Sequence, residues 1–247
     1  MKDQYSAIAA GRELGRPEEP ADCEVVVFAG PSLRRTDVAD LRKLAVQAGR
    51  KLSLRPPVRR NDLLDLADSA ARYNVVMVDG EFGQRLAVSI TEIRSVLRAG
   101  QPLTGASSMG ALRAVECRKL GMTGSGWVYE QYLSGAITSD AEVALLYDPD
   151  EYLPVTIPLV NLRWLLAEKA RSGTLSAEAS AAALSVAGVI HFRDRRPSVL
   201  LRCWKAELPA NTFGILESEM PSELRDTWDR KRLDAIDAIR LALGAQK

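Results

Sequence analysis

The residues with the clearest chemical potential lie in the segment PLTGASSMGALRAVE, at positions 102–116. Two adjacent serines, Ser107 and Ser108, separate a strand-like stretch from a helix-like stretch, among small residues that let a ligand approach the backbone. The first N–H groups of a helix lack partners and carry the positive end of its dipole. A hydroxyl at position 108 would therefore lie where a developing oxyanion is stabilised, with the Met109 and Gly110 N–H groups as donors. The alternative is that either serine only caps the helix, and a nucleophile can also occupy a cap position.

A serine becomes a nucleophile only beside a base. His191 is the one histidine and follows the serines as in α/β-hydrolases, but GASSMG does not match G-x-S-x-G. Its apolar neighbours favour a structural role for this histidine. A lysine kept neutral by burial is the other candidate, and local spacing selects none of the lysines. Arg113, about one turn from the serines, could hold a carboxylate or pair with Glu116.

The segments around these residues predict an α/β fold. Apolar, β-branched runs at 24–30 and 75–80 are typical of strands buried on both faces, and 102–106 is a third strand-like stretch. Helix-like segments alternate with them at 36–49, 61–74, 91–100 and 109–121. This alternation predicts a parallel sheet between two helical layers, with a short extra strand within 50–57.

The turns after these strands define the candidate pocket. Carboxyl ends of parallel strands meet at one edge of a sheet, which is where such folds bind ligands. The turns at 29–32, 78–82 and 105–110 would therefore converge. Ser32 and Asp79 are expected beside the serines. Glu92, in the first turn of a helix, and Glu116 complete the predicted pocket residues.

Three regions are predicted along the chain. Residues 1–22 are polar, contain glycine and proline, and are expected to form a flexible arm. Residues 23–150 are expected to form the α/β core. Residues 151–247 are expected to form a helical C-terminal region, because segments 159–173, 176–190, 195–208 and 222–243 have amphipathic helical periodicity.

Composition narrows the functional classes. Of 247 residues, 47% are hydrophobic and 26% charged, and the net charge is +1, which indicates neither a nucleic-acid nor a membrane partner. No signal peptide and no bilayer-length apolar run is recognised. One histidine and three scattered cysteines predict no metal site, no cofactor and a reducing, cytoplasmic location.

Several stretches together resemble one family, the TfuA-like proteins, over roughly residues 24–165. These stretches are VVVFAGPSL, PPVRRNDLLD, VVMVDGEF, VSITEI, GASSMGALRAVECRKLGMTGSGWVYEQYLSGAITSDAEVALL and VTIPLVNLRW. The most specific feature is GASSMGALRA followed by GMTGSG. The resemblance implies a partner of a YcaO enzyme in forming backbone thioamides on ribosomally made peptides, as in bacterial natural products. The precursor peptide itself would be contacted only indirectly.

The resemblance also implies a chemistry. TfuA-like proteins are expected to hydrolyse the C-terminal thiocarboxylate of a ThiS-type ubiquitin-like sulfur carrier, with a serine and lysine pair. The motif serine is Ser108, with Ser107 as the less favoured neighbour. The family lysine is expected where this chain has Thr91, and Lys119 lies at the far end of the helix after the serines. Lys43 or Lys169 would need the fold to bring them in.

Two alternatives stay open at this stage. The chain could be a non-catalytic adaptor that docks the YcaO enzyme and the sulfur carrier, which the missing lysine favours. It could instead be an unrelated serine esterase that uses His191. The sequence does not decide whether the chain forms a homo-oligomer.

Overall fold

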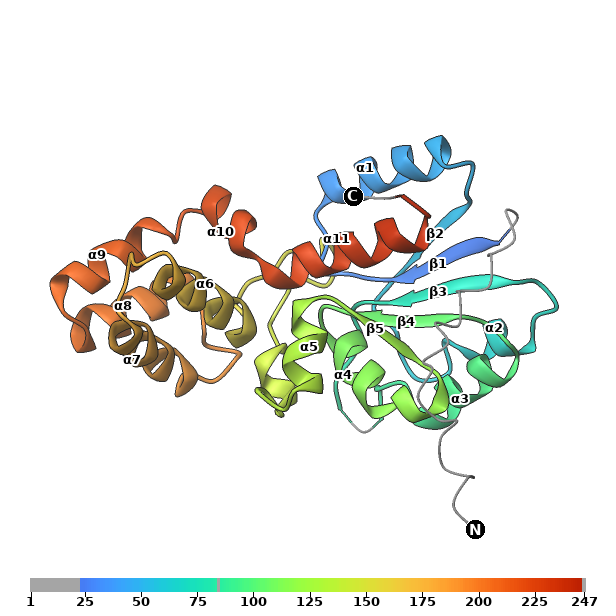
Figure 1. Cartoon of the computed structure of the whole chain (residues 1–247), viewed down its shortest axis with the longest axis horizontal. Coiled ribbons are helices and arrows are strands. Elements are labelled where there is room, and N and C mark those ends of the chain that lie inside the picture. Colours follow the sequence, from blue (N-terminus) through green and yellow to red (C-terminus); the bar gives the residue numbers. More distant parts are fainter. Residues whose placement is uncertain (1–22, 84, 246–247) are drawn as a thin grey trace, which may run out of the picture.

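The structure is a computed structural model that describes residues 23–83 and 85–245, so the arm predicted at 1–22 lies outside the described residues. A five-stranded, all-parallel sheet has the order β2-β1-β3-β4-β5 (Figure 1). The strands are β1 (Glu24–Phe28), β2 (Leu52–Arg55), β3 (Tyr73–Met77), β4 (Leu103–Ala106) and β5 (Thr123–Ser125). The predicted α/β class is thereby confirmed. No helix within the described ranges has the length and apolar character needed to cross a membrane.

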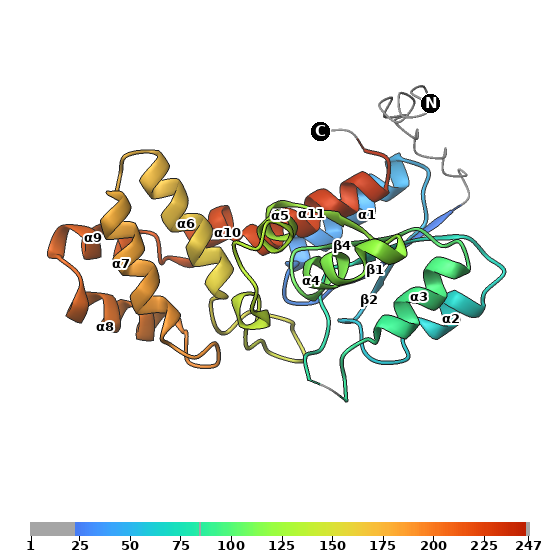
Figure 2. The ribbon, with the colours of Figure 1, turned by 60° about the horizontal axis from the view of Figure 1, so that its bottom comes forward.

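Helices cover both faces of the sheet. Successive strand residues point to opposite faces, and apolar side chains lie on each of them. Val26 and Phe28 pack in one layer, whereas Val25 and Val27 pack in the other. The first layer contains α2 (Leu64–Asp68), α3 (Ile90–Arg98), α4 (Met109–Glu116) and α5 (Trp127–Leu133). The second layer contains α1 (Arg35–Gln47) and α11 (Arg230–Ala242) (Figure 2).

The remaining helices form a separate lobe beside the sheet (Figure 1). They are α6 (Leu159–Arg171), α7 (Ala177–Gly188), α8 (Pro197–Glu207), α9 (Ala210–Ser218) and α10 (Ser222–Trp228). The lobe has its own core, centred on the fully buried Trp204, whose indole N–H donates to the Ala183 carbonyl at 2.9 Å. Two short 3₁₀ turns complete the fold: η1 (Arg118–Leu120) lies between α4 and β5, and η2 (Asp140–Glu142) lies between α5 and α6.

The segment 222–243, expected to be one helix, is two helices separated at Asp229. The backbone there has φ −66° and ψ 87°, outside the helical region, and the Asp229 side chain caps α11 by accepting from the Arg232 N–H. The chain therefore turns back from the lobe, and α11 packs on the sheet through Ala235, Ala238 and Ile239. Region 151–247 thus forms the lobe and then re-enters the α/β core.

Two glycines explain the small residues between β4 and α4. A Cβ atom at Gly110 would lie 1.8 Å from the Met77 carbonyl oxygen, and one at Gly105 would lie 2.0 Å from the Gly110 oxygen. The backbone of α4 therefore rests directly against strands β3 and β4. This close approach fixes the position of the serines that lie between the two glycines.

Candidate functional site

The turn between β4 and α4 leaves the Ser108 hydroxyl unused by local structure. Ser107 has a left-handed φ of 69°, which is uncommon for a residue other than glycine. It is fully buried, and its hydroxyl donates to the Ser32 hydroxyl at 3.1 Å. Ser108 occupies the N-cap position of α4, but its side chain makes no capping hydrogen bond. Of the two serines, Ser108 is therefore the one whose hydroxyl is available to a ligand.

Asp79 organises the neighbouring turns. Its carboxylate accepts from the Gly30 N–H and the Ser32 N–H, both at 2.9 Å, and from the Ser32 hydroxyl at 2.7 Å. These residues follow β1 and β3, the two strands between which this sheet order reverses its winding and where doubly wound folds bind ligands. Through Ser32, the Asp79 carboxylate is linked to Ser107. The predicted convergence of Ser32, Asp79 and the serines is thus present in the structure.

A cavity of about 290 Å³ opens at this edge of the sheet, and Ser108 lines it. Asp79, Phe82 and Tyr147 also line it, and the loop between α7 and α8 contributes Phe192 and Arg193. Ser108 is only 3% exposed, so the cavity is the route by which a reactant reaches its hydroxyl.

Lys231 supplies an amine to the same cavity. It lies in the first turn of α11, is 2% exposed, and its Nζ donates to the Val143 carbonyl at 2.9 Å. Burial lowers the pKa of the Lys231 ammonium below its ordinary value, while the charges of Asp79 and Asp229 act in the opposite direction. Within the described residues, no carboxylate lies within ion-pair distance of this Nζ, since Lys231 has no salt bridge there. A lysine in this setting can exist as the neutral amine that a general base requires.

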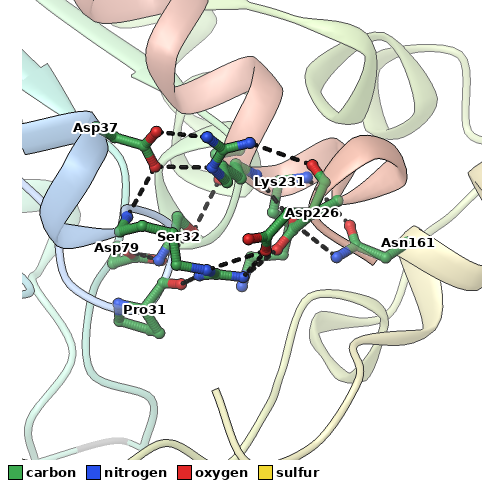
Figure 3. A network of polar contacts seen from close by, with 11 residues as sticks. Pro31, Ser32, Asp37, Asp79, Asn161, Asp226 and Lys231 are labelled. Carbon is green, nitrogen blue, oxygen red and sulfur yellow. Dashed lines mark hydrogen bonds and ion pairs between the residues drawn. The ribbon is translucent and has the colours of Figure 1, made fainter. Parts of the chain in front are cut away.

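The break at Asp229 sets the position of Lys231. Figure 3 shows Lys231 in a polar network that includes Asn161 and Asp226. The Asp229 carboxylate accepts from the Asn161 side chain at 2.7 Å and from Arg34 at 2.9 Å. Asn161 in turn accepts from the Lys231 backbone N–H at 3.1 Å. Asp37, on α1, pairs with Arg232. The start of α11 is therefore fixed both to the lobe and to α1.

The glycines of GMTGSG fix the same helix from another side. Gly126 has φ +95°, and a Cβ atom there would lie 2.5 Å from the Asp234 side chain. Asp234, fully buried on α11, accepts from the Val128 N–H at 2.7 Å and pairs with Arg230. The motif therefore fixes α11 against α5, and α11 carries Lys231, which lines the same cavity as Ser108.

The two expected oxyanion donors, the Met109 and Gly110 N–H groups, differ in whether they already donate a hydrogen bond. The Gly110 N–H donates to the Val78 carbonyl at 3.1 Å and is therefore occupied. In the described part of the chain, no hydrogen bond engages the Met109 N–H, so it is the donor that stays available beside Ser108.

Three further predicted residues lie away from this cavity. Arg113 pairs with Glu116, and both line a separate cavity of about 470 Å³. Glu92 forms a capping box with Ser89 at the start of α3 and also accepts from the Asn61 N–H at 2.6 Å. The Glu92 carboxylate therefore stabilises a helix start and a neighbouring turn.

The other candidate bases also lie elsewhere. Thr91 belongs to α3, Lys43 pairs with Asp40 on α1, and Lys169 pairs with Glu219 inside the lobe. The His191 ring is tilted by 37° against the Phe192 ring with centroids 4.5 Å apart, and Phe192 rather than His191 lines the Ser108 cavity. Sequence reasoning missed Lys231, because its position depends on the helix break at Asp229. The usable signal was the aspartate itself, a favoured N-cap residue, inside the apparent helix WDRKRLD.

The described residues hold no group of three or more His, Cys, Asp or Glu side chains able to bind a metal ion. The fold and the site define a doubly wound, parallel α/β protein with a serine and a buried lysine in one cavity at the carboxyl edge of its sheet. Residues 79–196 match the family described as TfuA-like protein, which confirms the predicted resemblance. Among curated proteins, no sequence matches the chain. Asp79 and Ser108 lie inside the matched region, whereas Lys231 lies outside it and is identified by geometry alone.

Proposed function

We propose that this TfuA-like protein is a serine hydrolase that releases sulfide from the C-terminal thiocarboxylate of a ThiS-type sulfur carrier and so assists a YcaO enzyme in thioamide formation. Ser108 is the nucleophile and Lys231 the base. The observation that carries the proposal is that these two side chains line one cavity, where burial favours the neutral form of the lysine.

The reaction proceeds in two steps. The neutral Lys231 amine accepts the Ser108 proton as Oγ attacks the thiocarboxylate carbon, and the Met109 N–H stabilises the charge on the carbonyl oxygen. The carbon–sulfur bond then breaks, Lys231 returns the proton, and sulfur leaves as HS⁻ while an ester to Ser108 remains. In the second step Lys231 accepts a proton from water, which attacks the ester. As the ester bond breaks, Lys231 returns that proton to Ser108 Oγ, and the carrier acid loses its own proton to water and leaves as the carboxylate.

The test is sulfide release from a thiocarboxylated carrier protein by the full chain. Ser108→Ala and Lys231→Met are expected to reduce the rate on the order of 10³-fold or more, as removal of a nucleophile or its base does in serine hydrolases. Lys169→Met is the matched control, because that lysine lies in the lobe and away from the cavity, and it should retain the wild-type rate.

The same assay separates the alternatives. Thermal unfolding and circular dichroism establish that each variant is folded. Equal sulfide release by wild type and folded Ser108→Ala would refute the hydrolase. Binding of carrier and YcaO enzyme without any sulfide release by the wild type would establish the adaptor function instead. An unchanged rate in His191→Ala would exclude the esterase that uses this histidine.

A further inference from the structure

The loop between α7 and α8 brings a cation from the helical lobe to the Ser108 cavity. Phe192 and Arg193 line this cavity, although both belong to the lobe and are far from Ser108 in sequence. The Arg193 guanidinium lies 5.5 Å from the centroid of the Phe192 ring. In the described ranges it makes no ion pair and no side-chain hydrogen bond. An arginine that lines a cavity without a carboxylate partner is suited to bind an anion.

A buried neighbour holds this loop in place. Arg195 is 3% exposed, and its guanidinium donates to three backbone carbonyls: Ala187 at 3.2 Å, Ile190 at 2.8 Å and Ile157 at 3.4 Å. The Arg195 carbonyl accepts from the Ile157 N–H at 2.9 Å. The loop is therefore fixed to the lobe and to the connector before α6, which preorganises the backbone that carries Arg193.

The carboxylates on the same cavity leave Arg193 free for a ligand. Asp79 already accepts three hydrogen bonds from the 30–32 turn. Glu81 accepts from the Tyr147 hydroxyl at 2.8 Å and pairs with Arg59 at 3.3 Å. Asp140 is exposed and is the carboxylate that could compete with a bound anion.

Arg193 is related to Ser108 by the cavity that the two residues share. Both residues line the same space, whose volume is about 290 Å³. A chain end that enters this space is therefore bounded both by Ser108 and by Arg193.

We propose that Arg193 is a substrate-positioning residue that binds the negatively charged C-terminal group of an extended protein tail in the Ser108 cavity. The inference rests on the proposed function and names its specificity: the enzyme selects a free terminal carboxylate or thiocarboxylate over a neutral chain end. The guanidinium fork matches the two terminal heteroatoms, and Phe192 packs against the tail.

The test uses binding, so that it does not depend on sulfide release. The probes are a ThiS-type carrier with a free C-terminal carboxylate and the same carrier with a C-terminal amide, measured against the full chain by calorimetry. Wild type is expected to bind the carboxylate form about tenfold more tightly or better, as charge-assisted hydrogen bonds do, with a preference that weakens at high salt. Arg193→Gln should abolish the preference, and Arg193→Lys should retain part of it.

Two further variants sharpen the result. Arg196→Gln is the matched control, because Arg196 is an exposed arginine of the same loop that does not line the cavity, and it should keep the full preference. Asp140→Asn should strengthen carboxylate binding by removing the competing charge. A wild type without a carboxylate preference, or an Arg193→Gln variant that keeps it, would overturn this inference. A preference that depends on Arg193 in a protein that releases no sulfide would refute the hydrolase alone.

Discussion

The sheet edge and the helical lobe contribute to the cavity in different ways. The sheet edge supplies Asp79 and Ser108 through turns that directly follow strands, so the parallel topology alone brings them together. The lobe supplies Arg193 from a loop held by a buried arginine, and the return from the lobe to the sheet supplies Lys231. Local structure therefore places Ser108, the proposed nucleophile, and long-range packing places Lys231, the proposed base.

The largest effect is expected from disrupting the sheet edge, where α4 packs against β3. Gly110→Ala places a methyl group 1.8 Å from the Met77 carbonyl oxygen, a backbone atom that has no room to move. We expect destabilisation above about 4 kcal/mol, or failure to fold, measured by chemical denaturation. Gly188→Ala is the control, since a Cβ atom there meets nothing within 4 Å. Equal stability of the two variants would contradict the close packing of α4 against β3.

A smaller effect is expected from disrupting the junction between α10 and α11, through which the chain returns from the lobe to the sheet. Asp229→Ala removes the cap of α11 and leaves Arg34 and Asn161 without their shared acceptor. The expected loss of unfolding free energy is about 2–4 kcal/mol, because a cap and a partly buried charged network are lost together. Sulfide release should fall as well, since Lys231 is two residues away.

Asp229→Asn sharpens this result, because its amide oxygen can still accept from the Arg232 N–H while the charge is removed. It should unfold at a denaturant concentration between those of the wild type and Asp229→Ala. If Asp229→Ala kept the wild-type rate and stability, the break between α10 and α11 would not be what positions the base.

The smallest effect is expected in the pH dependence of sulfide release, which depends on Lys231 from the lobe side and on Asp79 from the sheet edge. The base must be neutral, so kcat/KM for sulfide release should rise about tenfold per pH unit below the pKa of Lys231 and level off above it. Burial lowers the pKa of this lysine, so the plateau should begin below the ordinary lysine range. The charged groups that affect it are Asp79 from the turn after β3, Asp229 from the helix junction and Arg34 from the start of α1.

Asp79→Asn tests the sign of this coupling. The Asp79 charge raises the pKa of Lys231, so its removal should shift the profile to lower pH. An asparagine can still accept from the Gly30 and Ser32 N–H groups and donate to the Ser32 hydroxyl, so the turn should persist. A shift to higher pH would show that Lys231 is not the titrating base.

The sequence predicts the sheet edge better than the lobe side for physical reasons. The runs that form β1 and β3 are apolar and β-branched, and turns rich in glycine and serine follow them, so strand, turn and site could be inferred together. The strand β5, Thr123–Ser125, is short and polar and was missed, because its pairing with β4 is decided by tertiary context. The predicted helix 61–74 shrinks to α2, since Tyr73 and Asn74 pair with β1.

The position of Lys231 could not be inferred in this way. Helical periodicity continues across Asp229, and what ends α10 there is a set of partners on α1 and α6 that are distant in sequence. The GMTGSG motif was recognised, but its purpose is clear only when Asp234 is seen against Gly126. Local pattern therefore identifies Ser108, the proposed nucleophile, but not Lys231, its proposed base.

The insertion of the lobe before α11 has a consequence for how the protein is made. A ribosome delivers the sheet and its serine long before it delivers the last helix, which both covers the sheet and carries the amine. A nascent chain that has not yet emerged through α11 contains Ser108, the proposed nucleophile, without Lys231, its proposed base. Under the proposed mechanism, sulfide release would therefore begin only after α11 has been synthesised and has packed on the sheet.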